Sequence, residues 1–166
     1  IALSTDFTIE QDFRNICHHN PVDIFVNRIP FENPLNHKNY LKMADHISEV
    51  SSQILPSEDI DIVAYGCTSG TIAIGADRIK EEVNKAKPKA KVTTPITAAM
   101  KAFNHLGLKK IAVLTPYPKD VNATVYNYLI DNNINVESFS SFNLEYDSEI
   151  AQVSLASLEK EISKID

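Results

Sequence analysis

The sequence predicts an α/β protein with parallel sheets, built as two similar lobes. Short apolar runs, several of them rich in β-branched residues, alternate along the 166 residues with segments of helical spacing. This alternation favours parallel strands that are joined by right-handed helical crossovers. A break near residues 87–91 separates two such series, so we expect a first lobe at residues 1–90 and a second lobe at residues 91–166.

The first series is predicted to contain three strands, at residues 1–3, 22–26 and 60–65, and three helices, at residues 8–18, 36–54 and 76–87. The longest of these helices carries apolar residues at helical spacing on one face, namely Tyr40, Ala44, Ile47, Val50 and Ile54. The strand at residues 60–65 is rich in β-branched residues, and a glycine cluster follows it directly.

The second series is predicted to contain three more strands, at residues 92–94, 110–114 and 135–139, and helices at residues 95–107, 119–131 and 148–164. Pro95 suits the first turn of a helix, and Gly107 suits the position just after its end. Residue 1 is Ile within the apparent tail of a strand, and no strand follows the last helix. We therefore expect that pieces of a longer protein are missing at both ends.

Composition and charge exclude several classes of protein. The net charge is −6, the isoelectric point is near 5.3, and the 16 Lys and Arg residues are scattered, so we expect no nucleic-acid partner. No apolar run approaches the roughly 18 residues of a membrane span. Two cysteines and the absence of a leader-like start favour a cytoplasmic protein. We also expect a homo-oligomer, a dimer.

The region around Cys67 is the strongest candidate for chemistry. Three of the four glycines (Gly66, Gly70 and Gly75) lie within ten residues of one another, and Cys67 sits among them at a predicted strand-to-helix turn. The positive end of the helix dipole would lower the thiol pKa from about 8.5 towards neutrality. The N–H groups and hydroxyls of Thr68 and Ser69 could receive a carboxylate or a developing enolate oxygen. The alternative is a buried cysteine that acts as a small hydrophobic residue.

Two further polar clusters are expected at the carboxyl ends of strands, where open parallel sheets bind ligands. They are Ser4-Thr5-Asp6 and Thr115-Pro116-Tyr117. Other motifs fail: a phosphatase-type loop would need Arg where Ala73 stands, and no glycine-rich phosphate loop follows any strand. The histidines lack metal-ligand spacing to cysteines or acids, so no metal site is expected.

Three segments together resemble the aspartate/glutamate racemase superfamily. They are residues 64–71, with the order Ala-Tyr-Gly-Cys-Thr-Ser-Gly-Thr, residues 92–95, and residues 113–117 together with 120–122. The branch that they resemble most comprises maleate cis–trans isomerases, arylmalonate decarboxylases and racemase-like ectoine-utilisation proteins. Ser4-Thr5-Asp6 with Thr8-Ile9-Glu10 is similar to the ectoine-utilisation members.

The resemblance implies two pseudo-symmetric lobes with the active site between them, and catalysis without metal or organic cofactor. It implies that Cys67 is the first-lobe cysteine, that Thr68 and Ser69 bind a substrate carboxylate, and that Tyr117 donates a hydrogen bond to it. Asp6 stands where the isomerases have asparagine, and Asp147 similarly replaces a substrate-binding asparagine. The second-lobe cysteine is expected after a strand beyond residue 166, and activity depends on it.

The function predicted on these grounds is that of a cofactor-independent racemase or isomerase. Cys67 would act at the carbon next to the carboxylate of a small amino or carboxylic acid, and Ser4, Asp6, Thr68, Ser69, Tyr117 and Asp147 would line the substrate site. The negative charge of Asp6 disfavours a dicarboxylate such as maleate and favours a substrate with an amine. The alternatives are an arylmalonate-type decarboxylase, a non-catalytic small-acid binding protein, and a cysteine hydrolase, which would need a histidine near Cys67.

Overall fold

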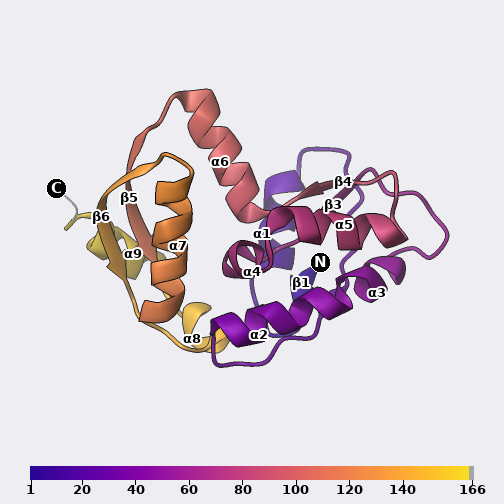
Figure 1. The fold of residues 1–166 in the computed structure, drawn as a ribbon, viewed down its shortest axis with the longest axis horizontal. Helices are drawn as coiled ribbons and strands as arrows, with labels where there is room; N and C mark the ends of the chain where they lie inside the picture. Colours follow the sequence, from indigo (N-terminus) through magenta and orange to yellow (C-terminus); the bar gives the residue numbers. More distant parts are fainter. Residues whose placement is uncertain (165–166) are drawn as a thin grey trace.

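The computed structural model describes residues 1–164 as pairs of parallel strands with helices packed against them (Figure 1). Strand β1 pairs with β2, β3 with β4, and β5 with β6, all in parallel. The first two pairs adjoin each other, because the nitrogen of Ile1 donates to the carbonyl of Ala64 and the Ile1 carbonyl accepts from Gly66. The predicted α/β class with parallel sheets is confirmed.

The first half of the chain contains three strands and most of the short helices. The elements are β1 (Ala2–Leu3), α1 (Ile9–Cys17), β2 (Arg28–Ile29), α2 (His37–Lys42), η1 (Met43–His46), α3 (Ile47–Ser52), β3 (Ile62–Ala64), α4 (Thr68–Ile74) and α5 (Ala76–Ala86). The long helix predicted at residues 36–54 begins as expected, with the Asn36 side chain accepting a hydrogen bond from the N–H of Asn39. Its middle tightens into the 3-10 turn η1, so it forms three consecutive helical pieces.

The second half begins with β4 and contains the longest helices. The elements are β4 (Lys91–Thr93), α6 (Pro95–Leu106), β5 (Lys110–Thr115), α7 (Lys119–Asp131), β6 (Asn135–Ser141), α8 (Asp147–Ile150) and α9 (Leu155–Ile162). Helix α6 carries the predicted end signals: Pro95 is its first residue, and Gly107 adopts φ of +69° directly after it. Thr94 and Thr97 form reciprocal capping hydrogen bonds at its start.

The strand predicted at residues 22–26 is wrong. This segment has no regular structure, and the strand that pairs with β1 is Arg28–Ile29 instead. Val22 and Phe25 are more than half exposed, and the segment lines an apolar pocket together with Phe13 and Cys17 of α1. Its apolar residues therefore face a pocket rather than a neighbouring strand.

The single helix predicted at residues 148–164 is also wrong. It is divided into α8 and α9, because Ser154 caps a new helix by accepting a hydrogen bond from the N–H of Ser157 at 3.1 Å. Serine at this position favours a helix start over a helix interior, since its side chain bonds to nearby backbone.

The pairing of β4 affects where the chain can be divided into two lobes. Val92 pairs with Val63 and Thr93 with Ala64, so β4 extends the sheet of the first half rather than that of the second. The sheet of the second half consists of β5 and β6, which lie on the other side of the molecule with α7 and α9 (Figure 1). The division into lobes at residue 90 remains a prediction.

Helix α4 lies where two hydrophobic clusters meet. The larger cluster includes Ile74 of α4 with residues of α2, α3 and α5, and the smaller one is centred on Val125, Leu129 and Ile134. Ile72 of α4 packs against the smaller cluster, and Tyr117 contacts both. Packing on both sides therefore fixes the start of α4, which carries Cys67.

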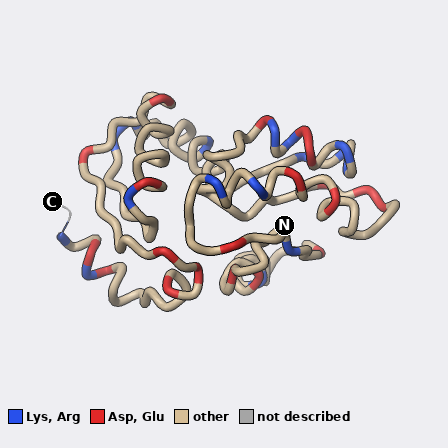
Figure 2. Tube along the Cα trace, turned by 60° about the horizontal axis from the view of Figure 1, so that its bottom comes forward, with Lys and Arg blue, Asp and Glu red and all other residues tan. Residues whose placement is uncertain are grey.

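Charged residues are spread along the whole chain, and Figure 2 shows blue and red segments interspersed over the trace. Among residues 1–164, no helix is long and apolar enough to cross a membrane. In the same residues, no group of three or more His, Cys, Asp or Glu side chains is arranged to hold a metal ion.

Candidate active site

The predicted site residues follow the carboxyl ends of three strands. The segment of residues 4–6 follows β1, Cys67 comes three residues after β3, and Tyr117 comes two residues after β5. Backbone hydrogen bonds between Ile1, which directly precedes the two-residue strand β1, and the end of β3 hold these two strands next to each other. Tyr117 reaches the same place from the second half, because its side chain packs against both hydrophobic clusters.

Cys67 caps the N-terminus of α4. Its backbone is extended, and its sulfur accepts a hydrogen bond from the N–H of Gly70 at 3.2 Å. The hydroxyl oxygen of Ser69 lies 3.8 Å from the same sulfur. The Cys67 carbonyl accepts hydrogen bonds from both the N–H and the hydroxyl of Thr71, at 3.0 and 2.5 Å. The thiol is therefore held in a defined orientation by the first turn of the helix.

Burial, rather than the helix terminus, decides the acidity of this thiol. Cys67 is 7% exposed, and loss of solvation raises its pKa to about 11. The hydrogen bonds from Gly70 and Ser69 oppose the shift, and the negative charges of Asp147 and Asp6 add to it. The predicted net shift of the thiol pKa towards neutrality is thus wrong, because the hydrogen bonds from the first turn of α4 do not compensate for the lost water.

Thr68, Ser69 and Tyr117 lie together at the thiol. Burial raises the pKa of the Tyr117 hydroxyl to about 12, with a further contribution from the charge of Cys67, whereas hydrogen bonding with Ser69 and Thr68 lowers it. Thr68 and Tyr117, from two parts of the chain, line one pocket, and the Ser69 hydroxyl lies beside the sulfur. Such a set can hold a carboxylate through several hydrogen bonds and can stabilise charge that develops on its oxygens.

The loop that carries Tyr117 is held by an amide side chain. Asn122 of α7 donates from Nδ2 to the Tyr117 carbonyl at 2.7 Å, and its Oδ1 accepts from the Thr115 hydroxyl at 2.5 Å. The hydroxyl of Ser141 also donates to the Tyr117 carbonyl, at 2.6 Å. Asn122 thus connects the end of β5 to the start of α7 and positions the tyrosine.

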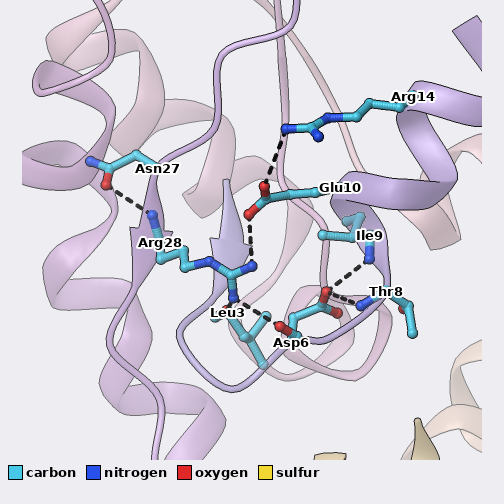
Figure 3. A network of polar contacts seen from close by, with 8 residues as sticks. All are labelled: Leu3, Asp6, Thr8, Ile9, Glu10, Arg14, Asn27 and Arg28. Carbon is cyan, nitrogen blue, oxygen red and sulfur yellow. Dashed lines mark hydrogen bonds and ion pairs between the residues drawn. The ribbon is translucent and has the colours of Figure 1, made fainter. Parts of the chain in front are cut away.

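The side chains of Asp6 and Ser4 are both hydrogen-bonded to backbone groups. Figure 3 shows the Asp6 carboxylate turned towards the N–H groups of Thr8 and Ile9, which donate to Oδ1 at 2.9 and 2.8 Å. Arg28 binds the Asp6 carbonyl and the Glu10 carboxylate rather than the Asp6 side chain. The Ser4 hydroxyl is hydrogen-bonded to both backbone groups of Phe31.

Asp147 is brought to the site by tertiary structure. The hydroxyl of Thr5 donates to Oδ2 of Asp147 at 2.5 Å, across 142 positions of sequence. Desolvation raises the pKa of Asp147, and the charge of Asp6 adds to this shift, whereas hydrogen bonding with Thr5 and Asn33 opposes it. The carboxylate is half-buried beside the loop that follows β1.

Sequence reasoning assigned Tyr40 to packing and did not consider Tyr65, but both lie near the thiol. Tyr40 is 2% exposed, and its hydroxyl, which lies close to Ser69 without a well-formed hydrogen bond, has no partner. Burial raises the pKa of Tyr40 and of Tyr65 well above the usual range, and the charge of Cys67 adds to both shifts. Tyr40 stands in the apolar stripe of its helix, so its spacing indicated only core packing.

Cys17 lies elsewhere. It ends α1, is partly exposed and lines the apolar pocket beside residues 22–26, together with Phe13 and Ile62. This pocket contains neither Cys67 nor Tyr117. The two cysteines of the chain therefore do not form a pair across one substrate site.

The fold and these side chains define an α/β protein of the aspartate/glutamate racemase-like superfamily, with a buried cysteine among hydroxyl groups at the ends of parallel strands. Residues 33–165 match the model of the arylmalonate decarboxylase family. Because this match covers well over half of the chain, the chain belongs to that family. No curated protein matches it.

Several solved structures share the fold. The maleate isomerase Iso from Pseudomonas putida is 18% identical, with a TM-score of 0.84 over 98% of this chain and 70% of its own. A mutant of maleate cis–trans isomerase from Nocardia farcinica with a covalently bound succinylcysteine intermediate is 14% identical, with a TM-score of 0.86 over 99% and 71%. A double mutant of arylmalonate decarboxylase in the liganded form is 19% identical, with a TM-score of 0.67 over 84% and 60%.

Proposed function

We propose that this chain carries the substrate-binding cysteine site of a cofactor-independent racemase or isomerase that acts at the carbon next to a carboxylate. The observation that carries the proposal is that the Ser69 hydroxyl lies 3.8 Å from the Cys67 sulfur, while the adjacent Thr68 lines one pocket together with Tyr117 from the second half of the chain. A cysteine placed beside hydroxyl donors can exchange a proton with a carbon whose adjacent carboxylate is held by those donors.

The three hydroxyl groups would bind the carboxylate and stabilise the enediolate-like state. The Cys67 thiolate would remove the proton from the adjacent carbon and become the thiol, while the electron pair moves onto the carboxylate oxygens. Return of a proton to the opposite face by a second acid inverts the carbon. Alternatively, the thiolate would add to the double bond of an unsaturated acid, by analogy with the covalently bound succinylcysteine intermediate of the Nocardia enzyme.

The buried thiol places a condition on this chemistry. With a pKa of about 11, Cys67 is protonated at neutral pH in the unliganded site. Its deprotonation is therefore coupled to substrate binding or to a partner group. A protonated thiol is ready to deliver a proton to an enediolate, and this favours an arylmalonate-type decarboxylase as the second candidate function. The family match supports that candidate as well.

Proton exchange in deuterated water separates the candidates. We expect the chain, or the full-length protein that contains it, to exchange the α-proton of small carboxylic or amino acids for deuterium, as observed by proton NMR. Cys67→Ser should reduce the rate at least a hundredfold, and Cys17→Ser should leave it unchanged. Release of carbon dioxide from an arylmalonate without such exchange would support the decarboxylase. Neither reaction, with retained ligand binding, would indicate a binding protein.

A further inference from the structure

The start of α1 packs against the residue before Cys67. Gly66 directly precedes Cys67, and its N–H donates to the Ile1 carbonyl at 2.9 Å. A Cβ atom at position 66 would overlap Cδ1 of Ile9, the first residue of α1, and would lie 3.2 Å from the Ile1 carbonyl oxygen. The Ile9 side chain therefore occupies the space beside the Gly66 backbone, and a shift of α1 would remove support from the peptide that carries the thiol.

Helix α1 is held mainly by polar contacts. None of its nine residues is buried, and Thr8, which precedes it, forms no side-chain cap. Its first N–H groups are bound by Asp6 instead, because those of Thr8 and Ile9 donate to Oδ1 at 2.9 and 2.8 Å. Helices in proteins owe most of their stability to a packed apolar face, so a helix that buries so little depends on the contacts at its start.

Arg28 connects this start to the sheet. From β2, its Nη1 donates to the carbonyls of Leu3 and Asp6 at 3.0 and 2.8 Å, and its Nη2 donates to the Glu10 carboxylate at 2.7 Å (Figure 3). One guanidinium group thus joins the last residue of β1, the following loop and the first turn of α1. The planar arrangement of its donors makes this possible, and a lysine ammonium group does not reproduce it.

The two carbonyl contacts of Arg28 matter more than its ion pair. The Arg28 and Glu10 side chains are 39% and 33% exposed, and exposed ion pairs contribute little to stability. Leu3 and Asp6 are the two ends of a turn, since the N–H of Asp6 donates to the Leu3 carbonyl at 3.1 Å. Binding both of these residues to one rigid group therefore fixes the shape of the turn that leads from β1 towards α1.

The same turn contacts the second half of the chain. Thr5 lies inside it, and its hydroxyl donates to Oδ2 of Asp147 at 2.5 Å. The loop before Asp147 is also bound to the first half, because the N–H of Leu35 donates to the Glu145 carbonyl at 2.9 Å. The turn that Arg28 holds therefore supports both the peptide before the reactive cysteine and a contact between the two halves.

We propose that Arg28 is a positioning residue for Cys67. By holding residues 3–6 and the first turn of α1, it keeps Ile9 against Gly66 and fixes the backbone from which the thiol projects. The inference rests on the proposed function in one respect, namely that Cys67 is the group that reacts. Arg28 acts through the backbone and takes no part in the chemical step. Because a reacting group that is displaced slightly loses much of its rate, a remote residue of this kind affects catalysis.

Hydrogen–deuterium exchange of the backbone, measured by mass spectrometry, tests the positioning role without a substrate. In Arg28→Ala, we expect exchange to accelerate at least about tenfold at residues 1–18 and 66–71, and to stay unchanged in α7 and β6. Arg28→Lys keeps the charge but not the planar donors, so it should accelerate exchange in the same two segments at least about threefold. Ile9→Ala removes only the packing contact and should accelerate exchange mainly at residues 66–71.

Two variants serve as matched controls. Arg14→Gln removes an ion pair with the same Glu10 carboxylate, at 4.0 Å, and should leave both segments protected. Lys87→Met removes an ammonium group that donates to the carbonyls of a different turn, at residues 55–58, and should accelerate the two segments no more than the rest of the core. Urea unfolding of every variant measures its global stability.

The proton-exchange assay with small carboxylic acids gives a second readout. Arg28→Ala should lower kcat for the exchange that depends on Cys67 about ten- to a hundredfold and change KM less than about threefold, because the thiol moves while the carboxylate-binding hydroxyls stay in place. Lys87→Met should change neither constant, so a loss of stability alone does not produce this difference between kcat and KM.

Unchanged backbone exchange at residues 66–71 in Arg28→Ala, or an acceleration spread evenly over the chain, would overturn the positioning role. Full protection in Arg28→Lys would also overturn it, because charge alone would then suffice. An active wild type with unaltered kcat in Arg28→Ala would refute the role of Arg28 and leave the proposed function standing. Local acceleration together with a wild type that exchanges no α-proton would instead refute the proposed function and retain the support of the Cys67 backbone by Arg28.

Discussion

The sulfur of Cys67 and the backbone nitrogen of Gly70 are joined by a hydrogen bond of 3.2 Å, and the contact leaves no room for a side chain at position 70. A Cβ atom there would lie 2.8 Å from the sulfur and 2.8 Å from Cε of Met43. Glycine is therefore required for close approach of the thiol to the helix.

The first prediction is that Gly70→Ala displaces the thiol. Overpacking should destabilise the protein by about 1–3 kcal/mol, although alanine inside a helix normally stabilises by about 0.5–1 kcal/mol relative to glycine. Urea unfolding measures the stability, and deuterium exchange should slow at least tenfold. A variant that is more stable than the wild type and equally active would show that the thiol does not depend on this contact.

The second prediction concerns the alkylation of the two cysteines. The position of Cys67 at a strand-to-helix turn predicted a thiol pKa near neutrality, but burial protects Cys67 and raises its pKa to about 11. A pKa that is higher by about two lowers the fraction of Cys67 present as thiolate near pH 8 about a hundredfold. A more basic thiolate is also more nucleophilic, and this offsets about tenfold of the loss in reaction rate. In the unliganded protein, Cys67 should therefore react about tenfold more slowly than when unfolded.

Iodoacetamide labelling of the Cys17→Ser and Cys67→Ser variants, followed by mass spectrometry from pH 7 to pH 11, checks this directly. Because the folded pKa is raised, labelling of Cys67 should keep increasing as the pH approaches about 11. Labelling of Cys67 at pH 7 that is faster in the folded than in the unfolded state would contradict the burial argument.

The third prediction concerns Asn122, which we infer to position Tyr117. Asn122→Ala removes the donor to the Tyr117 carbonyl and the acceptor of the Thr115 hydroxyl. We expect weaker binding of small carboxylates by about three- to thirtyfold and a loss of about 1–2 kcal/mol in unfolding free energy.

Asn132→Ala is the matched control for Asn122. Asn132 also donates to a tyrosine carbonyl, that of Tyr128 at 2.8 Å, but at the far end of α7. It should affect stability alone. If both variants weaken carboxylate binding equally, Asn122 has no specific positioning role.

The fourth prediction concerns a buried lysine that closes a loop. Lys87 is 5% exposed, and its ammonium group donates to the carbonyls of Leu55 and Glu58 at 2.8 and 2.9 Å. These hydrogen bonds stabilise a turn in which Leu55 and Ser57 have positive φ. Lys87→Met should destabilise the protein by about 2–3 kcal/mol, because it leaves both carbonyls without their charged donor.

Lys89→Met provides the comparison for Lys87→Met. Lys89 pairs with Asp59 at 2.6 Å, but both side chains are exposed, so the loss should be below about 1 kcal/mol. Equal effects of the two substitutions in urea unfolding would mean that the Lys87 hydrogen bonds add nothing beyond a surface ion pair.

Local signals in the sequence determined those helices whose first and last residues favour a helix start or a helix end. Pro95 and Gly107 bound α6 as predicted, and α7 spans the predicted residues. These signals act over a few residues, so they do not depend on the rest of the fold. The predictions failed at residues 22–26 and at Ser154, where a partner strand and a new helix cap decide the outcome.

The residue types around Cys67 were also evident from the sequence, because a cysteine, two hydroxyl residues and glycines follow a strand directly. Only the tertiary structure decided which distant groups join them. Thr5 donates a hydrogen bond to Asp147 across 142 positions of sequence, and Tyr40, which its spacing assigned to core packing, also lies near the thiol. The acidity of Cys67 was decided in the same way, since it depends on how much water the folded chain excludes and on charges contributed by distant loops.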